Sequence, residues 1–144
     1  MLRFTKRADY GLIAIHYIAV NQEDGAMSVK RIAETFNIPH ELLAKILQRL
    51  AKKGFIDSHN GPKGGYVLSR APEKITVGQV IRALEGPINI VSCLEHLDCP
   101  QLARCNLRRP AQKIQASISY LLDTMTLAEL MGDTIPGLEL TTAN

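Results

Sequence analysis

Long apolar runs are absent from this chain of 144 residues, and this absence limits where the protein can work. No run of about 18 apolar residues occurs, so we expect no membrane-spanning helix and no membrane partner. Residues 1–7 lack the apolar stretch of a secretory signal and lead directly into a helical pattern, which favours a cytoplasmic protein. The length suits one domain, with room for an oligomerisation element.

Enzyme signatures are absent as well. The sequence contains no nucleophile paired with a base, no phosphate-binding glycine loop and no HExxH helix. The four histidines, at positions 16, 40, 59 and 96, fall in unrelated elements. We therefore expect that the protein is not an enzyme.

Cysteine is scarce, but its placement is unusual. Cys93, Cys99 and Cys105 are the only three, and each stands six residues from the next among polar residues. Structural cysteines behave as small apolar residues of a core, so these three resemble ligands instead. An odd count in a reducing compartment favours metal or redox chemistry over disulfides. Soft thiolates at this spacing could hold three corners of an iron–sulfur cluster.

Two other uses of the cysteines remain open. A structural zinc site could combine the three thiolates with His96, although the two-residue cysteine spacing of zinc modules is absent. A thiol switch without a cluster could instead form around a reactive cysteine near Arg104.

Positive charge is concentrated in the first half of the chain. Residues 1–70 carry eleven Lys and Arg against six Asp and Glu, whereas residues 71–144 carry six against eight. The basic half is therefore where we expect a surface for nucleic acid.

The same half predicts a helix-turn-helix motif. Helical spacing indicates helices over residues 6–21, 29–36 and 40–53, and Thr5 and Ser28 are suited to cap the first two. A short helix, a tight turn and a longer helix with a basic outer face predict that the longer helix enters the major groove. The residues expected to face inward are Leu12, Ile15, His16, Ala19, Val29, Ile32, Ala33, Phe36, Leu43, Ile46, Leu47 and Leu50.

A β-hairpin should follow the motif. Residues 55–59 and 66–69 have the composition of strands, and the glycine-rich turn between them carries Lys63. Such a wing suits contact with phosphates or a minor groove. We therefore predict a fold that is mainly α with a small β-hairpin wing: a winged helix-turn-helix domain over residues 1–86, followed by a long dimerisation helix.

Candidate DNA contacts lie on the longer helix, at the ends of its neighbours and at the wing tip. Gln48 could pair with adenine and Arg49 with guanine, each pair contributing roughly 1–3 kcal/mol of discrimination. The full set of candidates is Arg3, Ser28, His40, Glu41, Lys45, Gln48, Arg49, Lys52, Asn60, Lys63 and Gly64.

The second half predicts a helix over 77–85, a cysteine segment over 87–108, a long helix with a closing helix over 109–131, and a tail over 132–144. The long helix should carry one apolar stripe, and its economical partner is the same helix of a second copy, because operators read by this motif are usually palindromic. An intramolecular stripe is the alternative. The stripe comprises Ile114, Ile118, Leu121, Leu122 and Met125.

Nearly the whole chain, residues 2–131, resembles the Rrf-type family of bacterial winged-helix transcriptional regulators, the IscR- and NsrR-like proteins. The motifs that carry the resemblance are Arg3-Phe4-Thr5, Asp9-Tyr10, residues 47–54, residues 61–66, the three cysteines and residues 126–130. The resemblance implies a homodimeric regulator of a double-stranded DNA operator, most often a repressor. It also implies an iron–sulfur cluster on the three cysteines, 4Fe-4S more than 2Fe-2S, which senses cluster or iron status, oxygen or nitric oxide.

The fourth cluster ligand differs within that family. Cluster-assembly regulators have a histidine three residues after the last cysteine, but this chain has Arg108, which cannot ligate. In nitric-oxide-sensitive members the ligand resembles an aspartate early in the first helix of the other subunit, and Asp9 matches that position. His96 remains an alternative, and Asp9 could instead be a surface carboxylate paired with Lys6 or Arg7. At the wing, Asn60 stands where family members often have arginine, so minor-groove contact would depend on Lys63.

Overall fold

The computed structural model describes residues 3–90 and 99–132. In these residues the helices are α1 Lys6–Val20, α2 Val29–Phe36, α3 His40–Lys52, α4 Val77–Glu85, α5 Arg108–Thr124 and α6 Leu127–Met131, with short 3₁₀ turns η1 Gln22–Asp24 and η2 Pro72–Lys74. The strands β1 Ile56–His59 and β2 Gly65–Leu68 form an antiparallel hairpin. The expected fold class, mainly α with a small β-hairpin wing, is confirmed.

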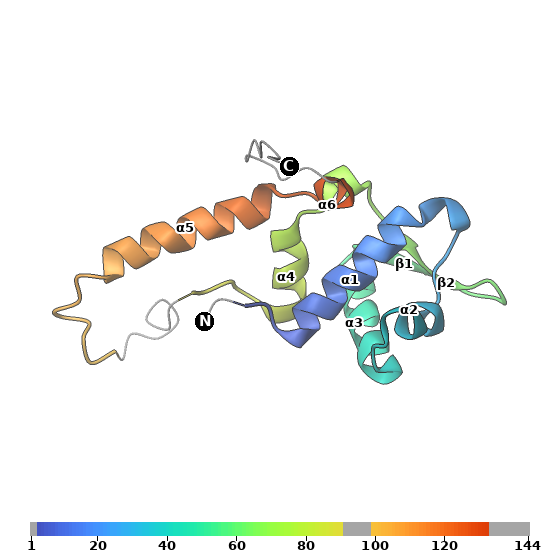
Figure 1. The fold of residues 1–144 in the computed structure, drawn as a ribbon, viewed down its shortest axis with the longest axis horizontal. Coiled ribbons are helices and arrows are strands. Elements are labelled where there is room, and N and C mark those ends of the chain that lie inside the picture. Colours follow the sequence, from blue (N-terminus) through green and yellow to red (C-terminus); the bar gives the residue numbers. More distant parts are fainter. Residues whose placement is uncertain (1–2, 91–98, 133–144) are drawn as a thin grey trace, which may run out of the picture.

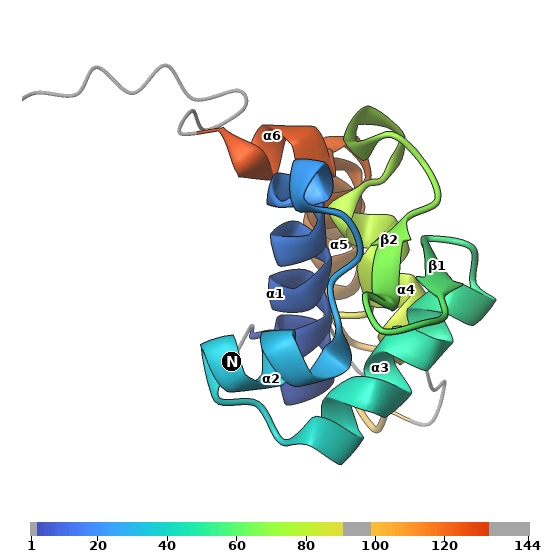
Figure 2. The ribbon, with the colours of Figure 1, turned by 90° about the vertical axis from the view of Figure 1, so that its right-hand side faces the viewer.

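Side-chain caps define the starts of the first two helices. Thr5 Oγ1 accepts a hydrogen bond from the backbone N–H of Ala8, and Ser28 Oγ accepts one from that of Arg31. Asn37, at φ 53°, takes the left-handed conformation that ends α2 before α3 begins. Figures 1 and 2 show α2 and α3 next to each other beside α1, as a helix-turn-helix requires.

The core confirms the predicted inner face of α3, since Leu43, Ile46, Leu47 and Leu50 are all buried. The prediction for Phe36 was wrong. Its side chain is 40% exposed and packs edge to face on Tyr17, with ring centroids 5.3 Å apart. A short helix of two turns buries only a narrow stripe, here Ile32 and Ala33, and the aromatic ring at its end lies outside that stripe.

The inner face of α1 is rotated relative to the prediction. Ile15 and Ala19 are buried as expected, but Leu12 and His16 are only half-buried. The difference arises because small residues of α1 lie against α4, where large side chains would not fit. A Cβ at Gly11, for example, would overlap the side chain of Leu84. The small buried residues of α1 are Ala8, Gly11, Ala14 and Ala19.

The hairpin is attached to the segment before α2 through Tyr66, near its turn. Its register runs from Ile56 opposite Leu68 to His59 opposite Gly65. Met27 and Tyr66 exchange two backbone hydrogen bonds of 2.9 and 2.8 Å, which join β2 to the segment before α2. The wing tip therefore has a fixed place beside the N-terminus of α2.

The long helix α5 extends away from the other helices (Figure 1). Its end is held by a backbone bridge in which Val77 N–H donates to Met125 O and Leu127 N–H donates to Ile75 O. The single predicted stripe is divided between two faces. Ile118, Leu122 and Met125 are half-buried, whereas Ile114 and Leu121 are each 49% exposed. No helix in the described ranges is long and apolar enough to span a membrane. The predicted tail beyond Gly132 lies outside the described residues.

Candidate nucleic-acid interface and cysteine site

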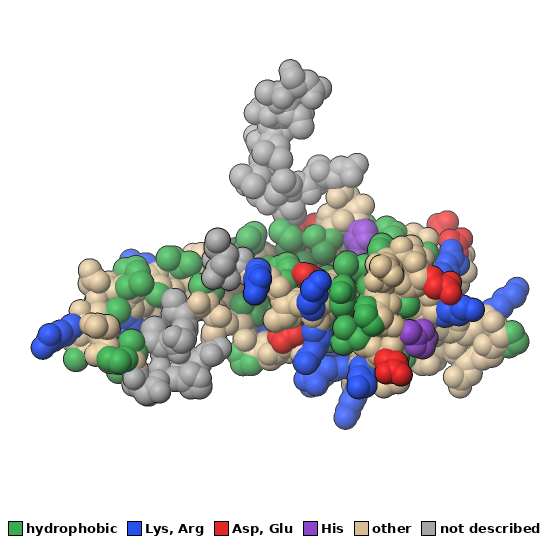
Figure 3. Space-filling model, turned by 60° about the horizontal axis from the view of Figure 1, so that its bottom comes forward, with side chains coloured by type: hydrophobic (Ala, Val, Ile, Leu, Met, Phe, Trp, Pro, Cys, Tyr) green, Lys and Arg blue, Asp and Glu red, His purple; other side chains and the backbone are tan. Residues whose placement is uncertain are grey.

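The outer face of α3 presents the predicted DNA-contacting side chains to solvent. Four of the five large apolar residues of this helix are buried in the core, and the fifth, Leu42, is exposed, so the outer face of the helix is mainly polar. The residues of the helix that were predicted to contact DNA, and that are exposed, are His40, Glu41, Lys45, Gln48, Arg49 and Lys52. The side of the molecule that carries α2 and α3 shows several Lys and Arg side chains (Figure 3).

Arg49 differs from the other exposed residues of α3 because it is tied to another helix. Its Nε donates a 2.7 Å hydrogen bond to the carbonyl oxygen of Ala83, in the last turn of α4. The last carbonyl groups of a helix have no hydrogen-bond donor within the helix, and the Arg49 guanidinium supplies one to Ala83. A contact between Arg49 and guanine would have to be made with its remaining nitrogens.

A polar hollow of about 360 Å³ separates the N-terminus of α2 from the wing tip. Ser28, Lys63 and Gly64, all predicted to contact DNA, line it. Arg31 also lines it, and its Nε donates to Tyr17 Oη at 3.2 Å. Arg31 was not among the predicted DNA contacts, although its place in the first turn of α2 could have indicated it. The remaining lining residues are Asp24, Gly25, Ala26 and Pro62.

The described part of the cysteine segment contains two of the three thiols. Cys99 and Cys105 are free and half-buried, and backbone turns between them join Leu102 N–H to Cys99 O and Arg104 N–H to Gln101 O. Cys93 and His96 lie outside the described residues. The described ranges bring together no group of three His, Cys, Asp or Glu side chains. The two thiols are nevertheless the soft donors that iron–sulfur clusters and zinc both accept.

Asp9 lies half-buried at the start of α1, beside a hollow of about 760 Å³ lined also by Arg3, Phe4, Thr5 and Lys6. Its expected alternative partners make other contacts. Arg7 donates to Leu84 O at 3.1 Å and lies 3.7 Å from Glu85 Oε1, while Lys6 Nζ lies 5.6 Å from the centre of the Tyr10 ring. Within residues 3–90 and 99–132 no ion pair holds the Asp9 carboxylate. Among the described residues Asp9 therefore forms no ion pair with Lys6 or Arg7.

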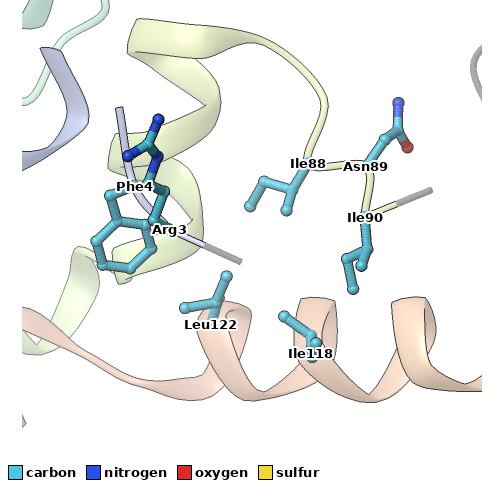
Figure 4. Close-up of a pocket in the computed structure, with 7 residues that line it drawn as sticks. All are labelled: Arg3, Phe4, Ile88, Asn89, Ile90, Ile118 and Leu122. Atoms are coloured by element: carbon cyan, nitrogen blue, oxygen red, sulfur yellow. The ribbon is translucent and has the colours of Figure 1, made fainter. Parts of the chain in front are cut away.

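The segment that leads into the cysteines borders an apolar hollow of about 480 Å³ on α5 (Figure 4). Ile88 and Ile90 point toward Ile118 and Leu122 of α5 across this hollow. Arg3 and Phe4 close one side of it. The start of the cysteine segment is therefore placed by the long helix.

One ion pair with a clear electrostatic effect joins α4 to α5. Arg82 donates through both terminal nitrogens to the Asp123 carboxylate. These hydrogen bonds lower the pKa of Asp123 and raise that of Arg82. The pair lies at the end of α5 opposite to the cysteine segment, so it orients the helix without taking part in the site.

Comparison with known proteins gives a consistent result. A family model described as Rrf2, iron-dependent transcriptional regulator, matches residues 4–133. The HTH-type transcriptional regulator NsrR of Bacillus licheniformis is 30% identical over 132 residues, which cover 90% of this chain and 92% of that protein. The HTH-type transcriptional regulator IscR of Photobacterium profundum is 32% identical over 132 residues, covering 92% of this chain and 77% of that protein.

A solved structure extends the similarity to three dimensions. The structure of CymR, the global cysteine regulator of B. subtilis, has a TM-score of 0.78 with this chain at 33% identity. The match covers 94% of this chain and all of that one. The similarity therefore extends beyond the helix-turn-helix to most of the chain.

Proposed function

We infer that this chain, which belongs to the Rrf2 family of transcriptional regulators, is a homodimeric operator-binding protein, most simply a repressor, whose affinity for DNA depends on an iron–sulfur cluster. Like its relatives, it is a regulator of transcription and not an enzyme. It acts on double-stranded DNA in the bacterial cytoplasm.

Operator binding rests on the exposed outer face of α3. An amphipathic helix that buries four apolar residues and exposes Lys45, Gln48 and Lys52 can enter a major groove without losing its packing. His40 and Glu41 lie in its first turn, which is the part that contacts base edges in this motif. This exposed face is the observation that carries the proposal.

The hollow between α2 and the wing supplies the phosphate contacts. Arg31 and Lys63 line this hollow beside the N-terminus of α2, against the single carboxylate of Asp24, and two cations next to a helix N-terminus attract an anion. A phosphate there would fix the register of α3 in the groove, and Asn60 at the wing would reach the neighbouring backbone. Arg3, exposed before α1, adds a further cation at the edge of the molecule.

The cluster would be held by Cys93, Cys99 and Cys105, with Asp9 of the partner subunit as the fourth ligand. A cluster of the 4Fe-4S type supplies a redox-active centre that oxygen, nitric oxide or iron shortage can alter. The residues of the chain provide soft thiolates on the segment before α5 and a carboxylate without an ion-pair partner in the described part of the chain. A carboxylate that bridges to the other subunit would tie the cysteine segment to the first helix of the opposite winged domain.

The dimer would form along the outer face of α5. Leu107, Ile114 and Leu121 stand seven residues apart, so they share one face of the helix, and they are 56%, 49% and 49% exposed. Apolar side chains of this size exposed in a row indicate a protein interface. Two winged domains held by paired α5 helices would meet half-sites at a fixed spacing, so a small change in their placement alters affinity for the operator.

A DNA titration tests the proposal. DNA selected from a random-sequence pool is titrated with protein in its cluster-loaded and its cluster-free form, at two salt concentrations. We expect the two forms to differ in affinity by at least about fivefold, and each affinity to fall steeply with salt. Equal affinity of the two forms would remove cluster control, and no selectable DNA would overturn the assignment of α3.

A thiol switch without a cluster is the second candidate. It is favoured by the free, half-buried state of Cys99 and Cys105 and by similarity to a protein described as a cysteine regulator. In that case metal-free protein would change its DNA affinity on oxidation with a mild disulfide reagent, and reduction would restore it. Cluster control predicts no such reversible change.

A further inference from the structure

We propose that Gln115 of α5 is the positioning residue of the cysteine site. Its side chain holds residues 88–90, the last described residues before Cys93, in place against the long helix. The importance of this clamp for a cluster rests on the proposed function, but the clamp itself is a property of the chain alone.

The contact engages both ends of the Gln115 amide. Ile90 N–H donates a 2.7 Å hydrogen bond to Gln115 Oε1, and Gln115 Nε2 donates to Ile88 O. Nε2 also donates to Ser119 Oγ, one turn further along the helix, at 3.1 Å. The amide thus pairs with residues 88–90 as a neighbouring β-strand would, and Ser119 fixes its orientation.

The clamp limits how far Cys93 can lie from α5. Cys93 follows Ile90 by three residues, so its Cα can lie at most about 10 Å from that of Ile90. Cys105 precedes the first residue of α5, Arg108, by the same number of residues and is limited in the same way. Gln115 lies seven residues into α5, about 10 Å along its axis from Arg108. One helix therefore anchors both ends of the cysteine segment, and this limits how far apart Cys93 and Cys105 can lie.

The apolar contacts around the amide reinforce this placement. Ile88 and Ile90 face Ile118 and Leu122 across the hollow of Figure 4. Upstream, the end of α4 is held by Arg49 and Arg7 through Ala83 O and Leu84 O. The chain that enters the cysteine segment is consequently fixed to α1, α3 and α5 before it reaches Cys93.

The test compares Gln115→Leu and Gln115→Glu with the matched control Gln112→Leu. Gln112 lies on the same helix, is exposed, and has no side-chain hydrogen bond among the described residues. Glutamate keeps an acceptor for Ile90 N–H but, when ionised, cannot donate to Ile88 O. The first readout is amide hydrogen exchange at Ile90 in cluster-free protein, which needs no metal. The second is the rate at which an iron chelator removes the cluster from anaerobically loaded protein.

We expect amide exchange at Ile90 to quicken about tenfold in Gln115→Leu, because the variant loses one hydrogen bond worth roughly 1.4 kcal/mol. Exchange should quicken less in Gln115→Glu and should not change in Gln112→Leu. Cluster loss should quicken in the same order. Unchanged exchange at Ile90 in a variant that keeps its helical circular dichroism would overturn the clamp. Altered exchange with unchanged cluster loss would overturn its role in positioning. A wild-type protein that takes up no cluster would contradict the proposed function, while the exchange experiment would still decide the clamp.

Discussion

Asp9 differs from Glu85, the other carboxylate beside the start of α1, because no neighbouring side chain binds it in the described part of the chain. Glu85 Oε1 accepts a 2.6 Å hydrogen bond from Thr5 Oγ1 and lies near Arg7, whereas Asp9 borders an open hollow. A carboxylate that is exposed to an open hollow and has no ion pair in the described part of the chain keeps its lone pairs available for a ligand brought by another subunit.

Replacing Asp9 with Asn or Ala should therefore weaken the cluster. Loss of a supporting contact at a metal site lowers affinity by about 10- to 100-fold, so the loss of a ligand should quicken cluster release by at least about tenfold. Iron retained per chain after anaerobic loading and desalting measures the effect. Asp57→Asn, on β1, is the matched control. Retention equal to wild type in Asp9→Ala would show that another group completes the site.

Contacts between individual residues were the hardest feature to predict from the sequence. The exposure of Lys45 and Gln48 followed from the amphipathic period of their helix. The bond of Arg49 to Ala83 and that of Gln115 to Ile90 did not, because each joins positions 34 or 25 residues apart. Such contacts depend on the angle between helices, which a periodic pattern does not specify.

Between elements, the Arg82–Asp123 pair joins α4 to the C-terminal end of α5. Both side chains are partly exposed, at 38% and 42%, so the pair should contribute less than about 1 kcal/mol. Because the hydrogen bonds from Arg82 lower the pKa of Asp123 in the folded state, the contribution is present above the ordinary aspartate pKa and is lost as pH falls through the lowered value.

Asp123→Asn should accordingly lower the free energy of unfolding at pH 7 by less than about 1 kcal/mol. The difference from wild type should shrink below about pH 4, where protonation removes the charge from the wild-type residue as well. Urea unfolding at a series of pH values measures it. Asp24→Asn, in η1, controls for the general effect of removing a surface charge. A difference that stays constant with pH would mean that the pair does not act through its charge.

Element boundaries were predictable to within one or two residues where a cap or a glycine marks them. Thr5 and Ser28 cap helices as expected, Thr76 caps α4, and Gly86, at φ 80°, follows α4. The faces were harder to predict where small residues dominate. Sequence analysis weighted large apolar side chains, and so missed that Gly11 allows α1 to lie against α4.

At the scale of the whole molecule, the long helix carries two separate apolar faces. One packs against residues of α4 and borders the segment 88–90, and the other, which comprises Leu107, Ile114 and Leu121, is exposed. The sequence predicted one stripe because apolar residues spaced three and four positions apart lie on the same side of a helix. Within the described residues a single copy covers only part of these apolar side chains, and the exposed part is the face that we propose meets a second copy.

Leu121→Glu should break this interface. A charge placed in the centre of an apolar interface is left unpaired and desolvated, so we expect a shift from dimer to monomer at micromolar concentration. Sedimentation velocity measures the shift, and circular dichroism checks that α5 persists. Gln112→Glu, exposed on the same helix but off this face, should remain dimeric. Dimers that survive Leu121→Glu unchanged would place the interface elsewhere.

The dependence on a cluster is tested most directly by iron and acid-labile sulfide assays on protein purified without oxygen, with its absorption spectrum. We expect equal amounts of iron and sulfide, about four of each per chain, with a broad visible band. Both should be absent from Cys99→Ser and Cys105→Ser proteins that keep their helical content. Colourless wild-type protein with one zinc per chain would contradict a cluster and assign the cysteines to a structural site. Colourless protein without metal, even after anaerobic reconstitution, would contradict it in favour of a thiol switch.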